Sequence, residues 1–292
     1  MVKRFLFTTL APYRWLVVAF MSCAISVAAQ DRAIELRRKL LDPNGDVMVA
    51  AHRAAHATYP ENSIDAIREA IRLKVDIIEI DVKVSKDGVP FLMHDRTMDR
   101  TTNGKGDPEQ LTWEELQRLS IVDKGKVTEL KIPSLETALS TAHGKILVDL
   151  DLKTDRIDDI VRIVEKTDMQ KDVLFFDSDY AVLQRVHSRN ADFMIMPRAY
   201  SAAQADSVIV LFDPPVVHID FDFYTDETVK IIKASRARAW INALGEPDAD
   251  IKAGNNKKAL KKLVGKGASI VQTDEPALLI KALEKSKTEA HD

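Results

Sequence analysis

Carboxylates occupy alternate positions in two short apolar runs of the sequence. Glu79 and Asp81 alternate with aliphatic residues in one run, and Asp149, Asp151 and Lys153 do so in another. Alternate residues of a strand share one face, so each run would bring its charged side chains together. Buried parallel strands are normally apolar almost throughout, and clustered carboxylates repel one another unless a cation neutralises them. Oxygen ligands favour a hard cation, Mg²⁺ or Ca²⁺. The alternative is that both runs are edge strands with a solvated face, where no cation is needed.

Two histidines stand at the ends of further strand-like runs. His52 is followed by Arg53, and His94 is followed by Asp95. A single histidine is more often structural, but a pair of imidazoles suits general acid–base chemistry near neutral pH. Arg53 and Lys153 could hold an anion beside the cation, and phosphate is the anion we expect.

Nine strand-like apolar runs follow one another along the chain after residue 46. Helical patterns lie between almost all of them, and such alternation is typical of a parallel sheet with crossover helices. The nine runs are Val47–Ala51, Ile77–Val84, Val89–Met93, Lys145–Leu152, Val173–Phe176, Phe193–Met196, Val216–Phe221, Arg238–Ala243 and Ala268–Gln272.

Nine runs are one more than an eight-stranded barrel needs. Only residues 85–88 separate the second run from the third, too few for a parallel crossover, and the Asp-Gly pair within them is typical of a hairpin. We therefore predict a TIM-type (β/α)8 barrel with one antiparallel accessory arm. Residues 97–132 form a small insertion after the third run, with one helix over 113–119, no strand, and a turn over Arg100–Gly104.

Composition excludes several classes of protein. The 292 residues include 42 Lys and Arg against 45 Asp and Glu, and 46% are hydrophobic. This is ordinary globular composition, unlike that of collagen, a low-complexity tail or a polytopic membrane protein, and it lacks the basic surplus of a nucleic-acid binder. With Cys23 as the single cysteine, neither a disulfide framework nor a thiolate zinc site is available.

The first 29 residues have the features of a secretory signal peptide. A basic start is followed by an uncharged, mostly apolar stretch over 15–29 that ends in small residues at Ala29. Residues 30–292 would then be one exported barrel domain, periplasmic or secreted, with 39 basic against 45 acidic residues and no stable membrane span. The alternatives are a retained signal anchor and a lipoprotein anchored at Cys23.

The order of these motifs resembles the glycerophosphodiester phosphodiesterase family. Six elements occur in sequence within about fifty residues, which is more specific than any one of them alone. They are His52-Arg53, Pro60-Glu61-Asn62-Ser63, Glu79-Ile80-Asp81-Val82, Lys86-Asp87-Gly88, His94-Asp95 and Arg100-Thr101-Thr102-Asn103-Gly104. The resemblance continues through Asp151-Leu152-Lys153, Trp240-Ile241-Asn242 and Thr273-Asp274-Glu275-Pro276.

The resemblance implies three kinds of role: ligands of one divalent metal ion, an acid–base pair and phosphate contacts. The residues are, in that order, Glu79, Asp81 and Asp151, then His52 and His94, then Arg53 and Lys153. Trp240 matches a position near the substrate, although core packing is the alternative for a strand tryptophan. The family usually has Glu where this chain has Asp151, which leaves Asp149 as another possible ligand, and usually has Gly where this chain has Ala54.

The activity that the resemblance implies is metal-dependent hydrolysis of glycerophosphodiesters to an alcohol and glycerol 3-phosphate. The glycerol 2-hydroxyl would attack first to form a cyclic phosphate, which water then opens. We take His52 as the base and His94 as the acid of the first step. The alternatives are a phospholipase- or sphingomyelinase-like lyase of the same superfamily, which would stop at the cyclic phosphate, and a non-catalytic phosphodiester-binding module. We expect no nucleic-acid partner, and the oligomeric state stays open.

Four further polar residues have more ordinary interpretations. Asn62 precedes a helical pattern and is predicted to be its N-cap. His218 and Asp220 share a strand face and either line the alcohol pocket or form a satisfied pair in the core. His56 has no partner pattern and is assigned to the surface.

Overall fold

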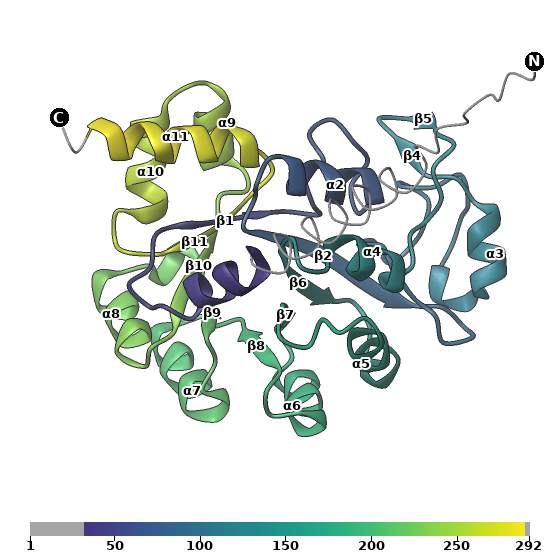
Figure 1. Cartoon of the computed structure of the whole chain (residues 1–292), viewed down its shortest axis with the longest axis horizontal. Helices are drawn as coiled ribbons and strands as arrows, with labels where there is room; N and C mark the ends of the chain where they lie inside the picture. The colour runs from purple at the N-terminus through teal and green to yellow at the C-terminus, as the bar shows by residue number, and fades with distance from the viewer. Residues whose placement is uncertain (1–31, 290–292) are drawn as a thin grey trace, which may run out of the picture.

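Eight parallel strands form the wall of the barrel in the computed structural model, which describes residues 32–289 (Figure 1). Neighbouring strands follow the order β8-β7-β6-β2-β1-β11-β10-β9, and a bridge between Arg198 and His218 joins the two ends. The strands are β1 (Met48–Ala51), β2 (Ile77–Val84), β6 (Leu147–Leu152), β7 (Val173–Asp177), β8 (Met194–Pro197), β9 (Val216–His218), β10 (Arg238–Asn242) and β11 (Ile270–Thr273). The predicted barrel is confirmed.

Helices cover the outside of this wall. Most begin at a Ser, Thr or Asp whose side chain accepts a hydrogen bond from the first turn, as Ser63 does for α2 and Thr225 for α8. Their apolar faces pack on the outward-facing side chains of the strands to form the main core. The helices are α2 (Ile64–Arg72), α4 (Leu135–Ala142), α5 (Ile157–Lys166), α6 (Tyr180–Arg189), α7 (Ala202–Phe212), α8 (Asp226–Ala234), α9 (Glu246–Lys252), α10 (Asn256–Val264) and α11 (Pro276–Glu289).

The accessory arm is the predicted hairpin. Strand β3 (Pro90–Leu92) pairs antiparallel with the end of β2, with Val84 opposite Pro90. Gly88 lies in the connecting turn with a φ of 88°, a conformation that glycine adopts without strain. The hairpin carries the residues that follow β3 to the edge of the barrel mouth, the end at which the carboxyl ends of the parallel strands lie.

The insertion is more structured than the sequence predicts. It holds a 3-10 turn (Pro108–Gln110), α3 (Trp113–Arg118) and two short strands, β4 (Val122–Asp123) and β5 (Lys126–Val127). The expectation of no strand was wrong because two-residue strands are too short to show alternation. Lys124 and Gly125, which connect β4 and β5, both have positive φ, as a type I′ hairpin turn requires.

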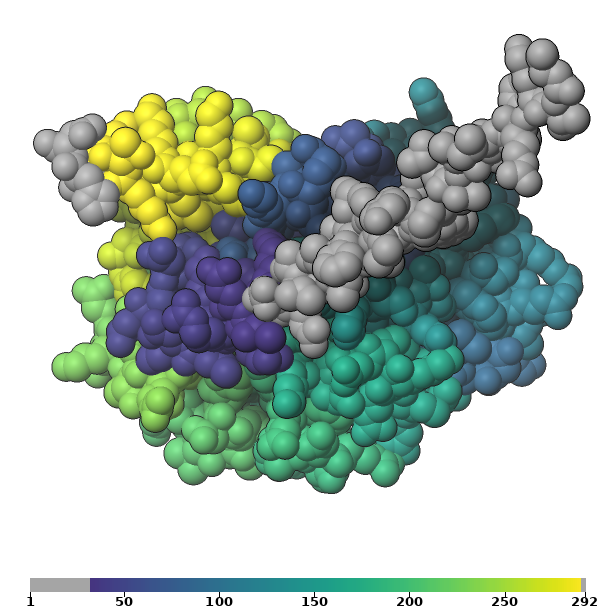
Figure 2. Space-filling model, viewed as in Figure 1, coloured from purple at the N-terminus to yellow at the C-terminus, as the bar shows by residue number. Residues whose placement is uncertain are grey.

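The helix over residues 32–40 closes the amino-terminal end of the barrel. Figure 1 shows it in front of the strands, and Figure 2 shows the first described residues, in purple, on the left half of this face. Leu36 and Leu40 pack on side chains at the amino-terminal end of the barrel interior, among them Met48 and Ile77. This end of the barrel is therefore a packed apolar plug.

Arg238 fastens that plug. Its guanidinium is fully buried and donates to the carbonyl oxygens of Lys39 at 2.6 Å, Asp46 at 2.6 Å and Ser269 at 2.8 Å. It also donates to the Ser269 hydroxyl at 3.0 Å. Burial lowers the pKa of Arg238 to about 10, so it remains a cation at neutral pH.

Within residues 32–289, no helix combines the length and the apolar character that crossing a bilayer requires. The predicted signal peptide, Cys23 included, lies outside the described residues.

Candidate active site

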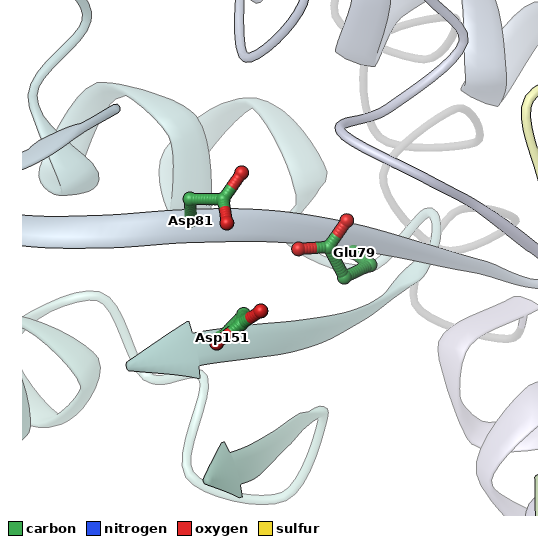
Figure 3. A group of neighbouring side chains, drawn as sticks. All are labelled: Glu79, Asp81 and Asp151. Carbon is green, nitrogen blue, oxygen red and sulfur yellow. The ribbon is translucent and has the colours of Figure 1, made fainter. Parts of the chain in front are cut away.

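Strands β2 and β6 bring the predicted carboxylates together. They pair in parallel, with Glu79 opposite Asp149 and Asp81 opposite Asp151. One oxygen each of Glu79, Asp81 and Asp151 lies within 4.8 Å of the others, and Figure 3 shows the three groups converging from the two strands. Because β2 lies between β1 and β6 and every residue in it is buried, the edge-strand alternative is wrong.

Burial makes this carboxylate cluster costly to ionise. Burial first, and then the neighbouring acids, raise the pKa of Glu79 well above its ordinary value. Burial also raises the pKa of Asp151 to about 6, against the opposing charge of Lys153. The Lys153 ammonium lies 2.6 Å from Asp151 and 3.4 Å from Asp81, and it is one positive charge among several negative ones.

The cluster fits a divalent cation. Its donors are all carboxylate oxygens, which suit Mg²⁺ or Ca²⁺. Buried Asp81 Oδ1 lies 3.4 Å from the Lys153 ammonium but accepts no hydrogen bond from any group in residues 32–289, so a lone pair remains for a metal ion. A cation at this position would supply the missing positive charge and occupy that lone pair.

Asp149 lies outside the cluster of three. Its side chain is buried, and Oδ1 finds no hydrogen-bond partner in the described part of the chain. Burial raises the pKa of Asp149 well above its ordinary value. Of the two candidates for the third ligand, the geometry therefore groups Asp151 with Glu79 and Asp81.

His52, which directly follows β1, has a carboxylate partner on one side and the cluster on the other. Its Nδ1 donates to Asp274 Oδ1 at 2.7 Å, and its Nε2 lies 4.0 Å from Glu79 Oε2. Burial disfavours the ionised form of Asp274, but the hydrogen bond and charge of His52 outweigh that effect and lower the pKa of Asp274. The expectation that His56 lies free on the surface was wrong: it is half-buried, with Nε2 3.6 Å from Asp274.

His94 reaches the mouth from the hairpin. It follows β3, and its Nδ1 donates to Asp95 Oδ1 at 2.8 Å. The two candidate acid–base residues thus come from different parts of the chain, and each has its own carboxylate.

Arg53 joins the site through its backbone as well as its side chain. Its N–H donates to Glu79 Oε2 at 2.7 Å, while its guanidinium lies 3.0 Å from Glu61 and 3.6 Å from Asp81. Arg53 and Ala54 have φ of 48° and 62°, in the left-handed region. The glycine usual in the family at position 54 would take this conformation freely, whereas alanine takes it at a cost of about 1 kcal/mol.

Asn62 was predicted to cap α2, and this was wrong. Ser63 is the N-cap, while the Asn62 amide donates to Asp81 Oδ2 at 2.8 Å and its Oδ1 accepts from the Asp81 N–H at 3.1 Å. The cap pattern in the sequence does not distinguish between two adjacent capping residues. In the structure, Asn62 instead fixes the orientation of a cluster carboxylate.

Trp240 lies beneath the site. It is 0% exposed, so it offers no surface for direct substrate contact, and its indole N–H donates to Asn242 Oδ1 and Gln272 Oε1 at 3.1 and 3.2 Å. Gln272 in turn donates to Glu79 Oε2 at 3.3 Å. Core packing, the alternative for Trp240, fits this position.

His218 completes the same network from β9. It is 2% exposed, and its Nε2 donates to Asn242 Oδ1 at 3.1 Å. Burial, together with the charge of Arg198, lowers the pKa of His218 to about 4. His218 is therefore neutral at physiological pH. Asp220, predicted to share a strand face with His218, lies beyond the end of β9 and pairs with Arg198, at 2.7 Å.

Comparison with known proteins places this arrangement in a family. The model of the glycerophosphoryl diester phosphodiesterase family matches residues 52–236. The glycerophosphodiester phosphodiesterase of Caldanaerobacter subterraneus is 38% identical over 110 residues, which are 37% of this chain and 45% of that protein. Human glycerophosphodiester phosphodiesterase 1 is 35% identical over 120 residues, which are 39% of this chain and 36% of its own. The match thus spans less than half the length of either relative.

Solved structures show the same fold. A glycerophosphodiester phosphodiesterase from Agrobacterium tumefaciens superposes with a TM-score of 0.70 at 22% identity, covering 80% of this chain and 99% of that one. An Oleispira antarctica phosphodiesterase, solved with its product sn-glycerol-3-phosphate, gives 0.71 at 24% identity, covering 81% and 96%. The chain belongs to the glycerophosphoryl diester phosphodiesterase family.

Proposed function

We propose that this chain hydrolyses glycerophosphodiesters to an alcohol and glycerol 3-phosphate with one divalent cation, Mg²⁺ or Ca²⁺. The observation that carries the proposal is the placement of His52. Its Nδ1 is held by Asp274, and its Nε2 faces the buried carboxylates, where a phosphate and its cation would meet. Related enzymes act on the same diesters, and the Oleispira enzyme holds glycerol 3-phosphate as product.

Glu79, Asp81 and Asp151 would hold the cation. Once bound, it would act as a Lewis acid that withdraws charge from a phosphate oxygen. Arg53 and Lys153 would bind the remaining phosphate oxygens. The charged side chains of Arg53 and Lys153 already lie beside Asp81, at 3.6 and 3.4 Å, so they would also balance the charge of the cluster.

His52 is the proposed base of the first step. Because Nδ1–H donates to Asp274, the lone pair of the neutral ring lies on Nε2. Nε2 would take the proton of the glycerol 2-hydroxyl as its oxygen bonds to phosphorus. Asp274 would hold the ring in this tautomer and stabilise the resulting imidazolium.

His94 is the proposed acid. Asp95 holds its Nδ1, which leaves an Nε2 proton of the imidazolium for the leaving alkoxide as the bond from phosphorus to the alcohol oxygen breaks. In the second step the roles reverse. His94 takes a proton from water, the water oxygen bonds to phosphorus, and His52 returns its proton to the glycerol 2-oxygen as the cyclic phosphate opens.

An assay with product analysis tests this function. Glycerophosphocholine, -ethanolamine, -inositol and -glycerol are incubated with protein treated with EDTA, then with added Mg²⁺ or Ca²⁺, and products are followed by ³¹P NMR. We expect glycerol 3-phosphate only when metal is added back. Accumulation of a cyclic phosphate alone would favour the lyase, and no turnover with any diester and either metal would favour the binding module.

We further propose that residues 1–29 direct export and are removed. Expression of the full chain in a bacterial host, followed by intact mass measurement, tests this. A mature protein that begins at Gln30 is expected. A retained full-length mass would indicate an anchor, and a lipid-modified chain beginning at Cys23 would indicate a lipoprotein.

A further inference from the structure

Arg100 bridges two loops at the mouth of the barrel. The sequence predicts only a turn at this position, yet the guanidinium makes four hydrogen bonds. Two go to Asp95, at 2.6 and 2.9 Å, and two go to Glu61, at 2.7 and 2.8 Å. Both pairs are bidentate, which gives each contact a defined geometry.

Each of these carboxylates continues to a residue of the proposed site. Asp95 Oδ1 accepts from His94 at 2.8 Å, and Glu61 Oε1 accepts from Arg53 at 3.0 Å. A continuous chain of charged groups therefore runs from the proposed acid through Arg100 to a proposed phosphate ligand. The hydrogen bond from Arg100 also lowers the pKa of Asp95.

Stability alone is a poor explanation for this arrangement. Arg100 is 49% exposed, and exposed ion pairs contribute little to folding. An apolar cluster of its own anchors the insertion, made of Phe91, Met93, Met98, Leu116 and Ile132. The bonds of Arg100 instead fix the orientation of two carboxylates, which is what a residue acting through other groups would do.

We propose that Arg100 is a positioning residue that sets the orientation of both His94 and Arg53 for catalysis. The proposal rests on the proposed function, because it assigns Arg100 a part in that same site.

The positioning role of Arg100 is tested by the kinetics of Arg100→Ala, with Arg118→Ala as a matched control. Arg118 also belongs to the insertion and pairs with a glutamate, Glu114 at 2.6 Å, but it is 71% exposed and makes no hydrogen bond or ion pair with His94, Asp95, Glu61 or Arg53. Loss of an outer partner of a catalytic group typically costs 10- to 100-fold in activity, and we expect kcat/KM of Arg100→Ala to fall by about that much. Added guanidinium should restore part of the loss, and Arg118→Ala should match the wild type.

Two further substitutions separate the two branches that leave Arg100, one through Asp95 to His94 and the other through Glu61 to Arg53. Asp95→Asn should mainly lower kcat through His94, and Glu61→Gln should mainly raise KM through Arg53. In the Arg100→Ala background each should add little, because the branch is already broken. Fully additive losses, or Arg100→Ala kinetics equal to those of Arg118→Ala, would overturn the proposal.

The ring ¹⁵N signals of His94 give a readout that does not depend on turnover. They should move in Arg100→Ala and stay in place in Arg118→Ala. If the wild type hydrolyses no diester, the proposed function fails while this measurement still reports on positioning. Unchanged His94 signals in Arg100→Ala refute positioning even in an active enzyme.

Discussion

The two ends of the barrel differ in whether their buried polar atoms have hydrogen-bond partners. At the amino-terminal end, Arg238 is fully buried and each of its contacts is a hydrogen bond to a carbonyl or hydroxyl oxygen. At the carboxyl end, buried atoms of Asp81, Asp149 and His218 have no hydrogen-bond partner among the described residues.

This contrast separates stability from function within one fold. A buried polar group that lacks a partner costs about 1 to 3 kcal/mol, so the mouth lowers the stability of the ion-free protein. The apolar plug at the closed base offsets part of that cost. Substitutions at the two ends should therefore affect different measurements: activity and ion binding at the mouth, and unfolding at the base.

The largest effect is expected at the mouth, from His52→Ala and His94→Ala. General acid–base groups contribute about 10²- to 10⁴-fold, so each variant should lose about three orders of magnitude in kcat. Folding and metal binding should remain close to wild type, as judged by thermal unfolding and calorimetry. His143→Ala, which changes an exposed residue at the base, is the control. Near-normal kcat in both mouth variants would disprove the acid–base assignment.

The second largest effect is expected at the base, from Arg238→Met. Met fills much of the same space but removes the guanidinium donor from the carbonyls of Lys39, Asp46 and Ser269. The Ser269 carbonyl keeps the Met48 N–H at 2.8 Å, whereas the Asp46 carbonyl loses its partner, so we expect a loss of about 3 kcal/mol in the free energy of unfolding. This would be read from denaturant curves, with exposed Arg236→Met as control, while kcat stays unchanged. A loss of activity without a loss of stability would show that the two ends are not separate.

Local rules account for what the sequence could predict. The alternation of Glu79 with Asp81 and of Asp149 with Asp151 reports the shared face directly, because strand geometry repeats every two residues. The hairpin of β2 and β3 followed from a four-residue separation. Helix and strand order then sufficed for a barrel.

Contacts between distant segments could not be predicted in this way. Asp274 pairs with His52 across 222 residues, and Arg100 with Glu61 across 39, so no periodicity connects them. The resemblance contained all four residues without indicating which touch. The strands β4 and β5 were missed for the opposite reason, since each is too short to carry any pattern.

A smaller effect is expected from His218→Gln, and it depends on pH. Because the folded state lowers the pKa of His218 from 6.5 to about 4, its neutral form stabilises the fold fully above pH 6.5. That stability is lost as the pH falls toward 4, where the unfolded chain binds the extra proton more readily. Gln still donates to Asn242 but does not titrate, so its loss of stability between pH 7.5 and 5 should be about 2 kcal/mol smaller than in wild type. Denaturant curves of the ion-free proteins at both pH values measure this, and parallel losses would contradict it.

A last comparison, with an effect of similar size, tests which part of the mouth binds the cation. Asp151→Asn removes a charge from the cluster of three, so we expect Mg²⁺ or Ca²⁺ affinity to fall by about 10- to 100-fold, or about 1 to 3 kcal/mol, by calorimetry. Asp149→Asn is its matched control, an equal change on the same strand face. Burial raises the pKa of Asp149 and favours its uncharged form, and the residue lies outside the cluster, so its variant should bind the ion within about threefold of wild type. If Asp149→Asn instead weakens binding as much as Asp151→Asn does, then Asp149 is itself a ligand. Its buried, unpartnered oxygen would then belong to the ion site rather than to the cost that the mouth imposes on folding.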